Sequence, residues 1–435
     1  MTMTVPADDD RPEVRDMQRW LQYAPTPPPR GTKKYDVFIS YRSSDRAWAM
    51  ALYDVLKLAS WEPFLDQYAL VPGTALETSL TDALEASSSG VVLWSSRTKD
   101  SEWCRRERTA MSTLARRGFN YIFAKLDDEE LPLFAQGDLY IDFSDSPEGA
   151  RGVNLLKLMC GMRGIALAPD AVKMAQKVDE DATRALVAIK AAISAKNVGR
   201  LTEIGTSSEP GMLASPAPVL AAAQGLISLG KNAEAQEVLR RARTNFPKSV
   251  RATQLEGLAL RRQQKFQDAI DVLSELKEAG HQDAETLGIL AAAWDGLYQK
   301  SEKIQQLRTS RELYRTAFQA DPKDYYTGIN AAAKSLFLGE RDEATRLAAA
   351  VLPLVEKAAD GEDFYAACTL AEVYLLQRNF AGAAAQYQRV ADKHLTRCGD
   401  LRGTRDQARR ICAAHGSSQE ETEKLLALFA FVDEE

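Results

Sequence analysis

The chain has 435 residues, a formal net charge of -6 and a hydrophobic fraction of 45%. The acidic balance argues against a dedicated nucleic-acid binder, which is usually basic, and no apolar run approaches the roughly 18 residues of a membrane helix. The polar, acidic N-terminus lacks the apolar core of a secretion signal. We therefore expect a cytoplasmic protein with no membrane and no nucleic-acid partner.

Cysteine and histidine are scattered along the chain. The 5 cysteines include no CxxC pair, and the 3 histidines all lie beyond residue 280. This usage fits reduced thiols better than a disulfide framework. Because no cysteines and histidines cluster, we expect no zinc site.

The first 33 residues form a polar N-terminal segment. They end in APTPPPRGTKK, a proline-rich stretch that is typical of an extended linker. A short helix is predicted before this stretch, at residues 11–23.

From residue 35 short apolar strands alternate with helices. Strands are predicted at 35–41, 62–66, 89–95, 120–127 and 138–144. Helices are predicted at 47–60, 73–87, 101–117 and 151–165. Gly118 fits a C-cap after the third of these helices. The alternation predicts an α/β domain over residues 34–165, with an open, parallel, flavodoxin-like sheet of five strands.

Beyond about residue 170 no strand pattern recurs. Helical, alanine-rich sequence continues to the end of the chain, interrupted by GTSSEPGMLASPAP at 205–218. This stretch, rich in Gly, Ser and Pro, is predicted to be a loop. We expect residues 166–217 to form a helical linker that ends in this loop.

A period appears in the helical part. Ala235 aligns with Ala269 at a spacing of 34 residues, Gly230 fits a turn glycine, and Pro247 fits a terminating proline. This is the tetratricopeptide pattern. Residues 218–435 are therefore predicted to form an all-α solenoid of stacked helix pairs. The alternative is an irregular helical bundle with chance periodicity.

Four segments carry a family resemblance. YDVFISYRSSD, FLDQYALVPGTALETSL, VVLWSS and SEWCRRE follow one another in this order. They resemble the successive motifs of a TIR domain, the Toll/interleukin-1 receptor fold, over about residues 34–160. The last segment is similar to the one that carries the catalytic glutamate of plant and bacterial TIR domains that hydrolyse NAD+. The resemblance implies that Glu107 is catalytic and that Trp103 adjoins the substrate.

The chemistry of NAD+ suits a site with one carboxylate. Glycosidic bonds usually need two, because the leaving oxygen must be protonated. Nicotinamide is attached as a pyridinium cation and leaves neutral, so no general acid is required. One carboxylate near the ribose can stabilise the developing oxocarbenium charge or attack it transiently. NAD+ is then a consumed substrate, and we expect no bound cofactor, since no GxGxxG follows a strand.

The other candidates for substrate binding follow the first two strands. Open α/β sheets bind ligands at the carboxyl ends of their strands, where Tyr41, Arg42 and Ser44 are expected. By resemblance, Arg42 is the best candidate to contact NAD+. Asp66 and Gly73 belong to the loop after the second strand, which in TIR relatives gates the cleft and takes part in assembly.

Each candidate also has a structural explanation. Glu107 would be a surface carboxylate paired with neighbouring arginines, and Trp103 would pack its helix against the sheet. Asp45 or the serines before it would cap the next helix. Arg105 and Arg106 depart from many relatives and would either alter the pKa of Glu107 or bind a phosphate. A Pro-Gly turn explains the loop near Gly73 by its geometry alone.

Residues 320–344 resemble the repeat region of apoptosis signal-regulating kinases and a bacterial domain found beside TIR domains. Together the resemblances imply a bacterial NAD+ hydrolase of defence signalling that self-associates through its TIR domain and binds a protein or peptide on its repeats. The alternative is a non-enzymatic TIR adaptor that acts by homotypic association. The glutamate favours the enzyme, because an adaptor does not need it. The trigger, the oligomer and the linear or cyclic form of the product remain open at this point.

Overall fold

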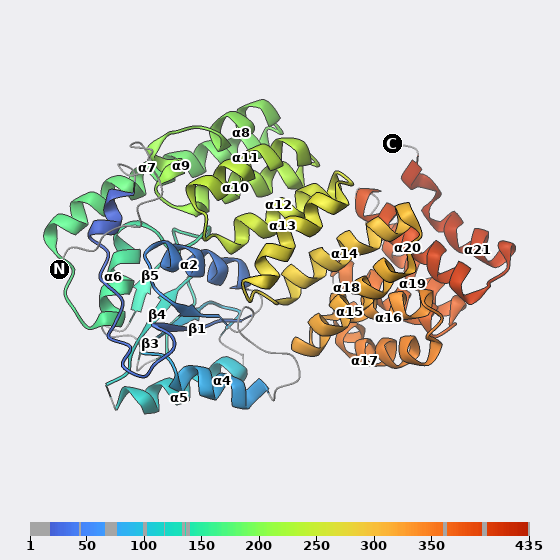
Figure 1. The fold of residues 1–435 in the computed structure, drawn as a ribbon, viewed down its shortest axis with the longest axis horizontal. Helices are drawn as coiled ribbons and strands as arrows, with labels where there is room; N and C mark the ends of the chain where they lie inside the picture. The colour runs from blue at the N-terminus through green and yellow to red at the C-terminus, as the bar shows by residue number, and fades with distance from the viewer. Residues whose placement is uncertain are drawn as a thin grey trace. The chain divides into compact units, whose positions relative to one another are not determined.

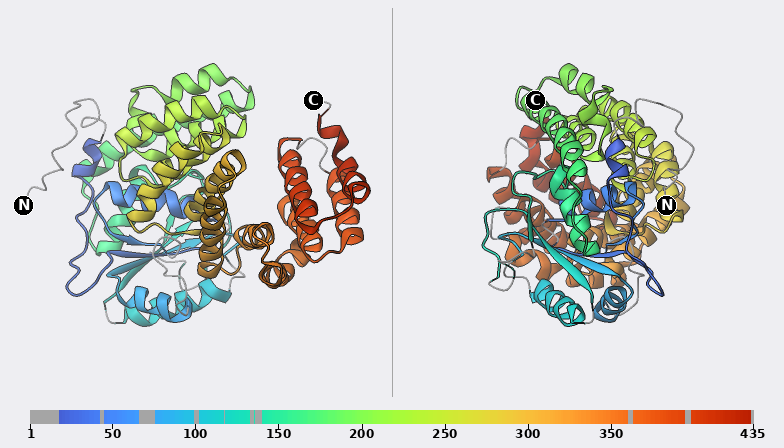
Figure 2. Two further views of the ribbon diagram at one scale, coloured as in Figure 1. Left: turned by 45° about the vertical axis from the view of Figure 1, so that its right-hand side comes forward. Right: turned by 90° about the vertical axis from the view of Figure 1, so that its left-hand side faces the viewer.

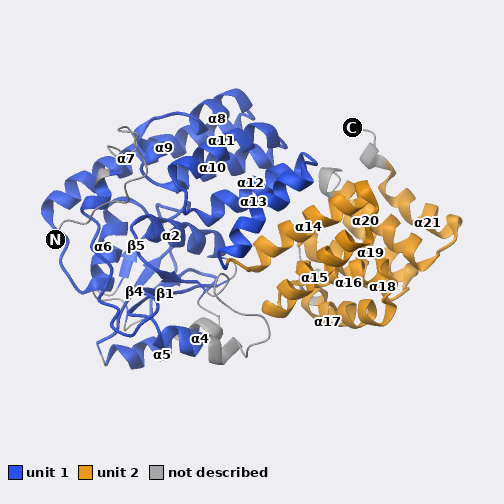
Figure 3. Cartoon of the chain, viewed as in Figure 1, with its two compact units in different colours: residues 1–70, 74–280 blue, residues 71–73, 281–435 orange. Residues whose placement is uncertain are grey.

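The structure is a computed structural model that describes residues 18–42, 45–65, 76–98, 102–116, 118–132, 135, 140–359, 363–393 and 398–433. The chain forms two compact units (Figure 3). The first contains the described residues up to Gly280, and the second contains those from His281 onward. A sheet and the first helical repeats share the first unit, whereas the described part of the second unit is helical.

The sheet of the first unit has five parallel strands in the order β2-β1-β3-β4-β5. They are β1 (Val37–Ser40), β2 (Pro63–Phe64), β3 (Ser89–Trp94), β4 (Asn120–Lys125) and β5 (Tyr140–Asp142). All residues of β1 and β3 are buried, because helices cover both faces of the sheet. The predicted flavodoxin-like sheet is confirmed.

Helices cover the two faces of this sheet. They are α2 (Arg46–Leu58), α4 (Leu76–Glu85), α5 (Glu102–Ala115) and α6 (Gly152–Arg163). α2 and α6 lie on one face, and α4 and α5 lie on the other (Figures 1 and 2). The core on the α4–α5 side is apolar and largely aromatic; it includes Phe38, Phe64, Leu80, Val92, Met111 and Phe123.

The segment before the sheet is anchored to the rest of the unit. η1 (Arg19–Gln22) contains the buried Trp20, whose Nε1 donates to the carbonyl oxygen of Ala214 at 2.8 Å. The buried Trp61 donates from Nε1 to the carbonyl oxygen of Pro25 at 3.0 Å. The proline-rich stretch itself contains neither helix nor strand, and the bond from Trp61 fixes its first proline, Pro25. That this stretch acts as an extended linker stays a prediction.

Helices make up the remainder of the first unit. They are α7 (Pro169–Ser194), α8 (Val198–Gly205), α9 (Pro210–Leu213), α10 (Pro216–Ser228), α11 (Asn232–Asn245), α12 (Val250–Arg262) and α13 (Phe266–Glu278). α9 and the start of α10 fall inside the predicted loop at 205–218, which is therefore partly wrong. Pro210 and Pro216 occupy the first turns of these helices, where the missing N–H of proline has no cost. The helix predicted at 11–23 lies mostly outside the described residues, and only its end appears, as η1.

The second unit continues the helix pairs. Its elements are α14 (Ala284–Ser301), α15 (Ile304–Ala320), α16 (Tyr325–Phe337), α17 (Arg341–Ala359), α18 (Phe364–Leu376), α19 (Phe380–Lys393), α20 (Cys398–His415), α21 (Gln419–Leu426) and η4 (Ala427–Asp433). Small residues let paired helices approach closely. A Cβ on Gly257 of α12 would lie only 2.6 Å from the Leu273 side chain of α13, and one on Gly328 of α16 would lie 2.6 Å from Val351 of α17. The predicted all-α solenoid is confirmed. None of the described helices combines the length and apolar character required to cross a membrane.

α2 also packs against the repeats within the first unit. Asp54 is buried and accepts hydrogen bonds from Ser249 Oγ at 2.5 Å and from the Val250 backbone N–H at 3.1 Å. Ser249 is the N-cap of α12, where its Oγ also accepts from the Ala252 N–H. Burial raises the pKa of Asp54 to about 6, although the hydrogen bonds oppose this shift. Leu58, at the end of α2, packs against the apolar core of the repeats.

Candidate active site

The carboxyl ends of β1 and β3 form the natural ligand edge of the sheet. These strands are neighbours, but the chain leaves β1 toward α2 on one face and leaves β3 toward α5 on the other (Figure 1). Open α/β sheets bind ligands where connections diverge in this way. Tyr41 and Arg42 follow β1, and residues 95–98 follow β3. The structure thus brings these two loops to one edge.

Two of the predicted substrate-binding residues lie at this edge. Tyr41 is buried with an exposed fraction of 7%, whereas Arg42 is exposed. Nη1 of Arg42 donates a hydrogen bond to the carbonyl oxygen of Arg97, in the loop after β3. Arg42 therefore connects the two loops and places a cation at their surface.

The buried carboxylate of Asp45 connects the same two loops. It occupies the N-cap position of α2 but makes no side-chain cap hydrogen bond. Instead, its Oδ2 accepts from Ser95 Oγ at 2.7 Å and from Thr98 Oγ1 at 3.2 Å. Nη1 of Arg97 lies 3.6 Å from the other carboxylate oxygen of Asp45. The explanation of Asp45 as a helix cap is thus wrong, because buried hydroxyls across the edge are its partners.

A second carboxylate, Asp127, holds the loop after β3 from the side of β4. Its two oxygens accept from the Ser96 backbone N–H at 3.0 and 2.9 Å, and Oδ2 also accepts from Ser96 Oγ at 2.8 Å. Burial raises the pKa of Asp127, but the bonds from Ser96 and Glu129 and the charge of Arg97 outweigh it, and the net shift is downward. Asp127 and Arg97 were not predicted. Their only signal was that polar residues follow two strands directly.

Glu107 and Trp103 both belong to α5, which follows the loop after β3. Their side chains lie outside the described part of the structure, as do the following residues entirely: Ser44, Asp66 and Gly73. Position 107 is one helical turn before Met111, whose side chain is fully buried. Arg108 lies over the Trp94 ring of β3, with its Cζ atom 4.9 Å from the ring centroid. The contacts of Arg108 and Met111 fix how α5 sits on the sheet.

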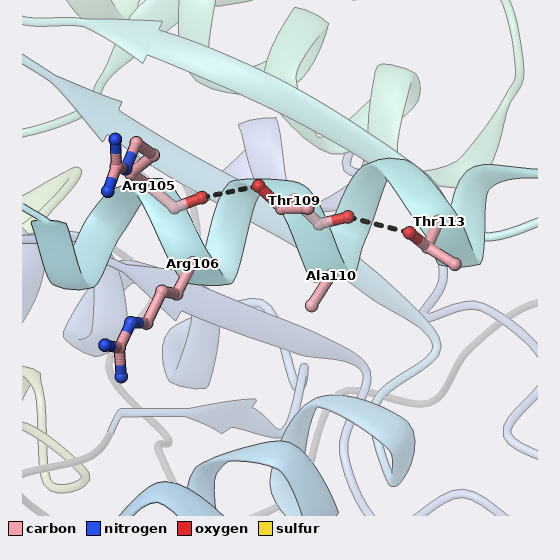
Figure 4. Close-up of a pocket in the computed structure, with 5 residues that line it drawn as sticks. All are labelled: Arg105, Arg106, Thr109, Ala110 and Thr113. Atoms are coloured by element: carbon pink, nitrogen blue, oxygen red, sulfur yellow. Dashed lines mark hydrogen bonds between the residues drawn. The ribbon is translucent and has the colours of Figure 1, made fainter.

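A shallow hollow lies along α5 itself (Figure 4). Its volume is about 390 Å³, and among the described residues its lining consists of Arg105, Arg106, Thr109, Ala110 and Thr113. The threonine hydroxyls donate to the carbonyl oxygens of residues one turn earlier in the helix. The lining residues that the structure describes all come from α5. Among the described residues no three His, Cys, Asp or Glu side chains are grouped so that they could hold a metal ion.

Comparison with known protein families assigns both parts of the chain. Residues 37–156 match the model of the TIR domain, and residues 231–337 match the model named Tetratricopeptide Repeats-Sensor. The curated protein "Probable 2' cyclic ADP-D-ribose synthase BdTIR" of Brachypodium distachyon is 34% identical over 116 residues, which cover 26% of this chain and 51% of that protein. The chain therefore spans about half the length of this relative.

Solved structures with similarity include two repeat proteins. A thermophilic tetratricopeptide protein of Thermus thermophilus is 21% identical with a TM-score of 0.36, covering 45% of this chain and 96% of its own. MamA of Desulfovibrio magneticus is 18% identical with a TM-score of 0.34, covering 42% of this chain and 98% of its own. On the two family matches, which agree with the motifs and the helical period, residues 37–156 form a TIR domain and residues 231–337 belong to a tetratricopeptide-type sensor domain.

Proposed function

We propose that the TIR domain is an enzyme that cleaves NAD+ between nicotinamide and ribose, with Glu107 as its catalytic carboxylate. The observation that carries this proposal is the place of SEWCRRE in the fold. The motif begins α5 just after the carboxyl end of β3, and position 107 precedes the buried Met111 by one turn. The relative named as a cyclic ADP-ribose synthase supports chemistry of the same class.

In the proposed reaction the bond between ribose C1 and the nicotinamide nitrogen breaks. Its electron pair passes to the nitrogen, which cancels the pyridinium charge and leaves the ribose as an oxocarbenium ion. The carboxylate of Glu107 stabilises that ion. Attack by water, with loss of one proton, gives ADP-ribose, whereas attack by a hydroxyl of the same molecule, also with loss of a proton, gives a cyclic product.

The loops at the edge of the sheet supply the rest of the proposed site. Arg42 and Arg97 carry positive charge there, suited to the pyrophosphate of NAD+. Asp45 and Asp127 hold the loop after β3 through its hydroxyls and backbone. Tyr41, Ser44, Asp66, Gly73 and Trp103 complete the proposed substrate contacts. NAD+ is the substrate in this scheme, with no bound cofactor.

The repeats are proposed to control this activity. A solenoid offers an extended surface for a protein or peptide ligand, and TIR domains associate with one another when the repeats receive their signal. We place the whole protein in the bacterial cytoplasm as a defence effector that lowers cellular NAD+. This role extends the resemblance and depends on the chemistry proposed for Glu107.

The test is nicotinamide release by the purified, concentrated full chain, followed by chromatography. Glu107→Gln keeps the size of the side chain and removes its charge, so we expect activity to fall about 100-fold or more. Glu85→Gln, an exposed carboxylate on α4, is the matched control and keeps full activity. Equal rates for Glu107→Gln and the parent would reject the assignment.

The same experiment separates the enzyme from the adaptor. Product analysis distinguishes linear from cyclic ADP-ribose. An adaptor would self-associate with increasing concentration or crowding and release no nicotinamide under any of these conditions.

A further inference from the structure

The segment before the sheet runs from the helices of the first unit to the start of β1. Residues 18–34, which we name the strap, contain η1 and otherwise neither helix nor strand (dark blue in Figure 1). Among their described side chains only those of Trp20 and Pro25 are buried. Three consecutive prolines at 27–29 lie within it, and proline-rich segments are semi-rigid. The strap is therefore a stiff connection with few points of attachment.

One end of the strap is attached to the helices by an indole. Trp20 donates from Nε1 to the carbonyl oxygen of Ala214 at 2.8 Å. Ala214 is the C-cap of α9, and the carbonyl groups at a helix end need donors from elsewhere. The residue four positions further on is Pro218, which has no N–H to offer. Trp20 thus supplies, from a distant part of the chain, a donor that Pro218 cannot.

The other end of the strap is attached to the sheet at several points. The carbonyl oxygen of Pro25 accepts from Trp61 Nε1 at 3.0 Å. Arg30 donates from Nε and Nη2 to the two carboxylate oxygens of Asp36 at 2.6 and 2.8 Å. Asp36, fully buried just before β1, also accepts from the backbone N–H of Glu62, just before β2, at 2.6 Å. This end therefore holds the beginnings of two neighbouring strands.

The two attachments differ in strength. At the sheet, Arg30 makes a bidentate pair with a buried carboxylate, and such pairs are strong. Losing Arg30 would leave Asp36 buried without its cation. At the helices, Trp20 is supported by Gln18, whose Nε2 lies 3.4 and 3.5 Å from two carbonyl oxygens, at the long limit of a hydrogen bond. We therefore expect the strap to detach at Trp20 first.

A second contact joins the same two parts of the first unit. Asp54 of α2 accepts hydrogen bonds from Ser249 and from the Val250 N–H at the start of α12. A movement of α9–α12 relative to the sheet must strain both this contact and the strap. Contacts that a movement must break stabilise the arrangement before the movement. The strap therefore protects the bonds of Asp54.

We propose that the strap is an autoinhibitory tie. It holds the TIR domain and the helices α9–α12 in a resting arrangement, and detachment of Trp20 lets these parts move relative to each other. Because the sheet end stays attached, Trp20 remains at a high effective concentration and the tie closes again when the signal ends. The structural part of this proposal does not depend on NAD+ cleavage, whereas its regulatory part rests on the function proposed above.

The test is hydrogen exchange in the full chain. In Trp20→Ala we expect the amides of η1 and the amide of Val250 to exchange at least about tenfold faster than in the parent. Val250 reports on the contact with α2, because its N–H bonds to Asp54. Tyr23→Ala is the matched control, since it removes an exposed aromatic side chain from the same segment, and it should leave both rates unchanged. Trp20→Phe keeps an apolar ring without the N–H and should lie between.

Two results would overturn the tie. Unchanged exchange at Val250 in Trp20→Ala would mean that the strap does not hold α12 to α2. Loss of protection in β1 and β3 would mean that Trp20 is required for the fold of the TIR domain itself.

Nicotinamide release tests the regulatory part. Because the resting arrangement is weakened, we expect Trp20→Ala to release nicotinamide about tenfold faster than the parent, and Tyr23→Ala at the rate of the parent. Equal rates for Trp20→Ala and the parent, with faster exchange at Val250, would overturn this part. If no variant releases nicotinamide, the proposed function and the regulatory part fall together, and exchange at Val250 still decides whether the strap is a tie.

Discussion

Asp54 in the first unit and Asp295 in the second are both carboxylates buried between helices, yet their pKa values shift in opposite directions. Asp54 accepts hydrogen bonds from a hydroxyl and a backbone N–H, and burial raises its pKa to about 6. Burial also acts on Asp295, but the charges of Lys334 and Arg410 outweigh it and hold the pKa well below its usual range. Neutral donors satisfy the oxygens of a buried carboxylate, whereas cations also balance its charge.

The two aspartates therefore make the stability of their units depend on pH in opposite directions. The raised pKa of Asp54 means that the folded state binds a proton more tightly than the unfolded state, so its contribution to stability is present at low pH and is lost as pH rises through 6. The lowered pKa of Asp295 gives a contribution that is present at neutral pH and is lost as the carboxylate becomes protonated at low pH.

The largest expected effect comes from breaking the charged cluster of Asp295, Lys334 and Arg410. Asp295→Ala leaves Lys334 buried without its carboxylate, and we expect the free energy of unfolding of the second unit to fall by about 3–5 kcal/mol. Hydrogen exchange of the amides in α14 and α16, measured as a function of urea concentration, gives the free energy of unfolding of this unit. Asp406→Ala, which removes an exposed partner of Arg409, is the control and should change little. A similar small loss for both variants would mean that the cluster has no special energetic role.

The next effect is the pH dependence of the first unit. From 3.8 to about 6 the pKa of Asp54 changes by roughly two units, which corresponds to at most about 3 kcal/mol. Asp54→Asn keeps the shape and does not titrate. We expect the parent to lose stability relative to Asp54→Asn between pH 4 and pH 7, measured by urea unfolding with tryptophan fluorescence.

The quantity to examine is the difference in free energy of unfolding between the parent and Asp54→Asn at each pH. The contributions of other titrating groups, Glu372 included, are the same in both proteins and cancel in this difference. Parallel pH profiles for the parent and Asp54→Asn would show that Asp54 is already ionised at low pH. The comparison with Asp295 would then fail, since both carboxylates would be charged throughout the accessible range.

The smallest of these effects concerns the neutral partner of Asp54. Ser249→Ala removes a hydrogen bond to the carboxylate and also the N-cap of α12. We expect a loss of about 1–2 kcal/mol in the first unit. Ser418→Ala, which removes the exposed N-cap of α21, is a matched control in the second unit. If the two variants cost the same amount in their own units, the cap alone accounts for Ser249 and the bond to Asp54 adds nothing.

Local patterns in the sequence predicted most of the fold. Apolar runs predicted β1, β3 and β4, and a spacing of 34 residues between alanines predicted the helix pairs. Partners far apart in the chain left no local signal. Asp54 bonds to Ser249 and Asp295 to Arg410, separations of 195 and 115 residues. For the same reason the bonds of Trp20 to Ala214 and of Trp61 to Pro25 could not be predicted.

The candidate site was predicted in part. Position after a strand was enough to select Tyr41 and Arg42, and the structure puts both at the expected edge. Asp45 was explained as a cap because a polar residue before a helix usually caps it, but its partners in the loop after β3 are tertiary. The roles of Glu107 and Trp103 stay predictions, since they rest on the SEWCRRE motif.

The helix α2 has a mechanical consequence for the TIR domain. It starts at Asp45, which holds the loop after β3, and nine residues further on it is bonded to α12 through Asp54. At 1.5 Å per residue, the part of α2 between Asp45 and Asp54 is a rigid connection about 14 Å long between the first repeats and the ligand edge. A rotation of α12 relative to the sheet must therefore either break the hydrogen bonds of Asp54 or rotate α2. If α2 rotates, the loops that carry Arg42 and Arg97 move with it.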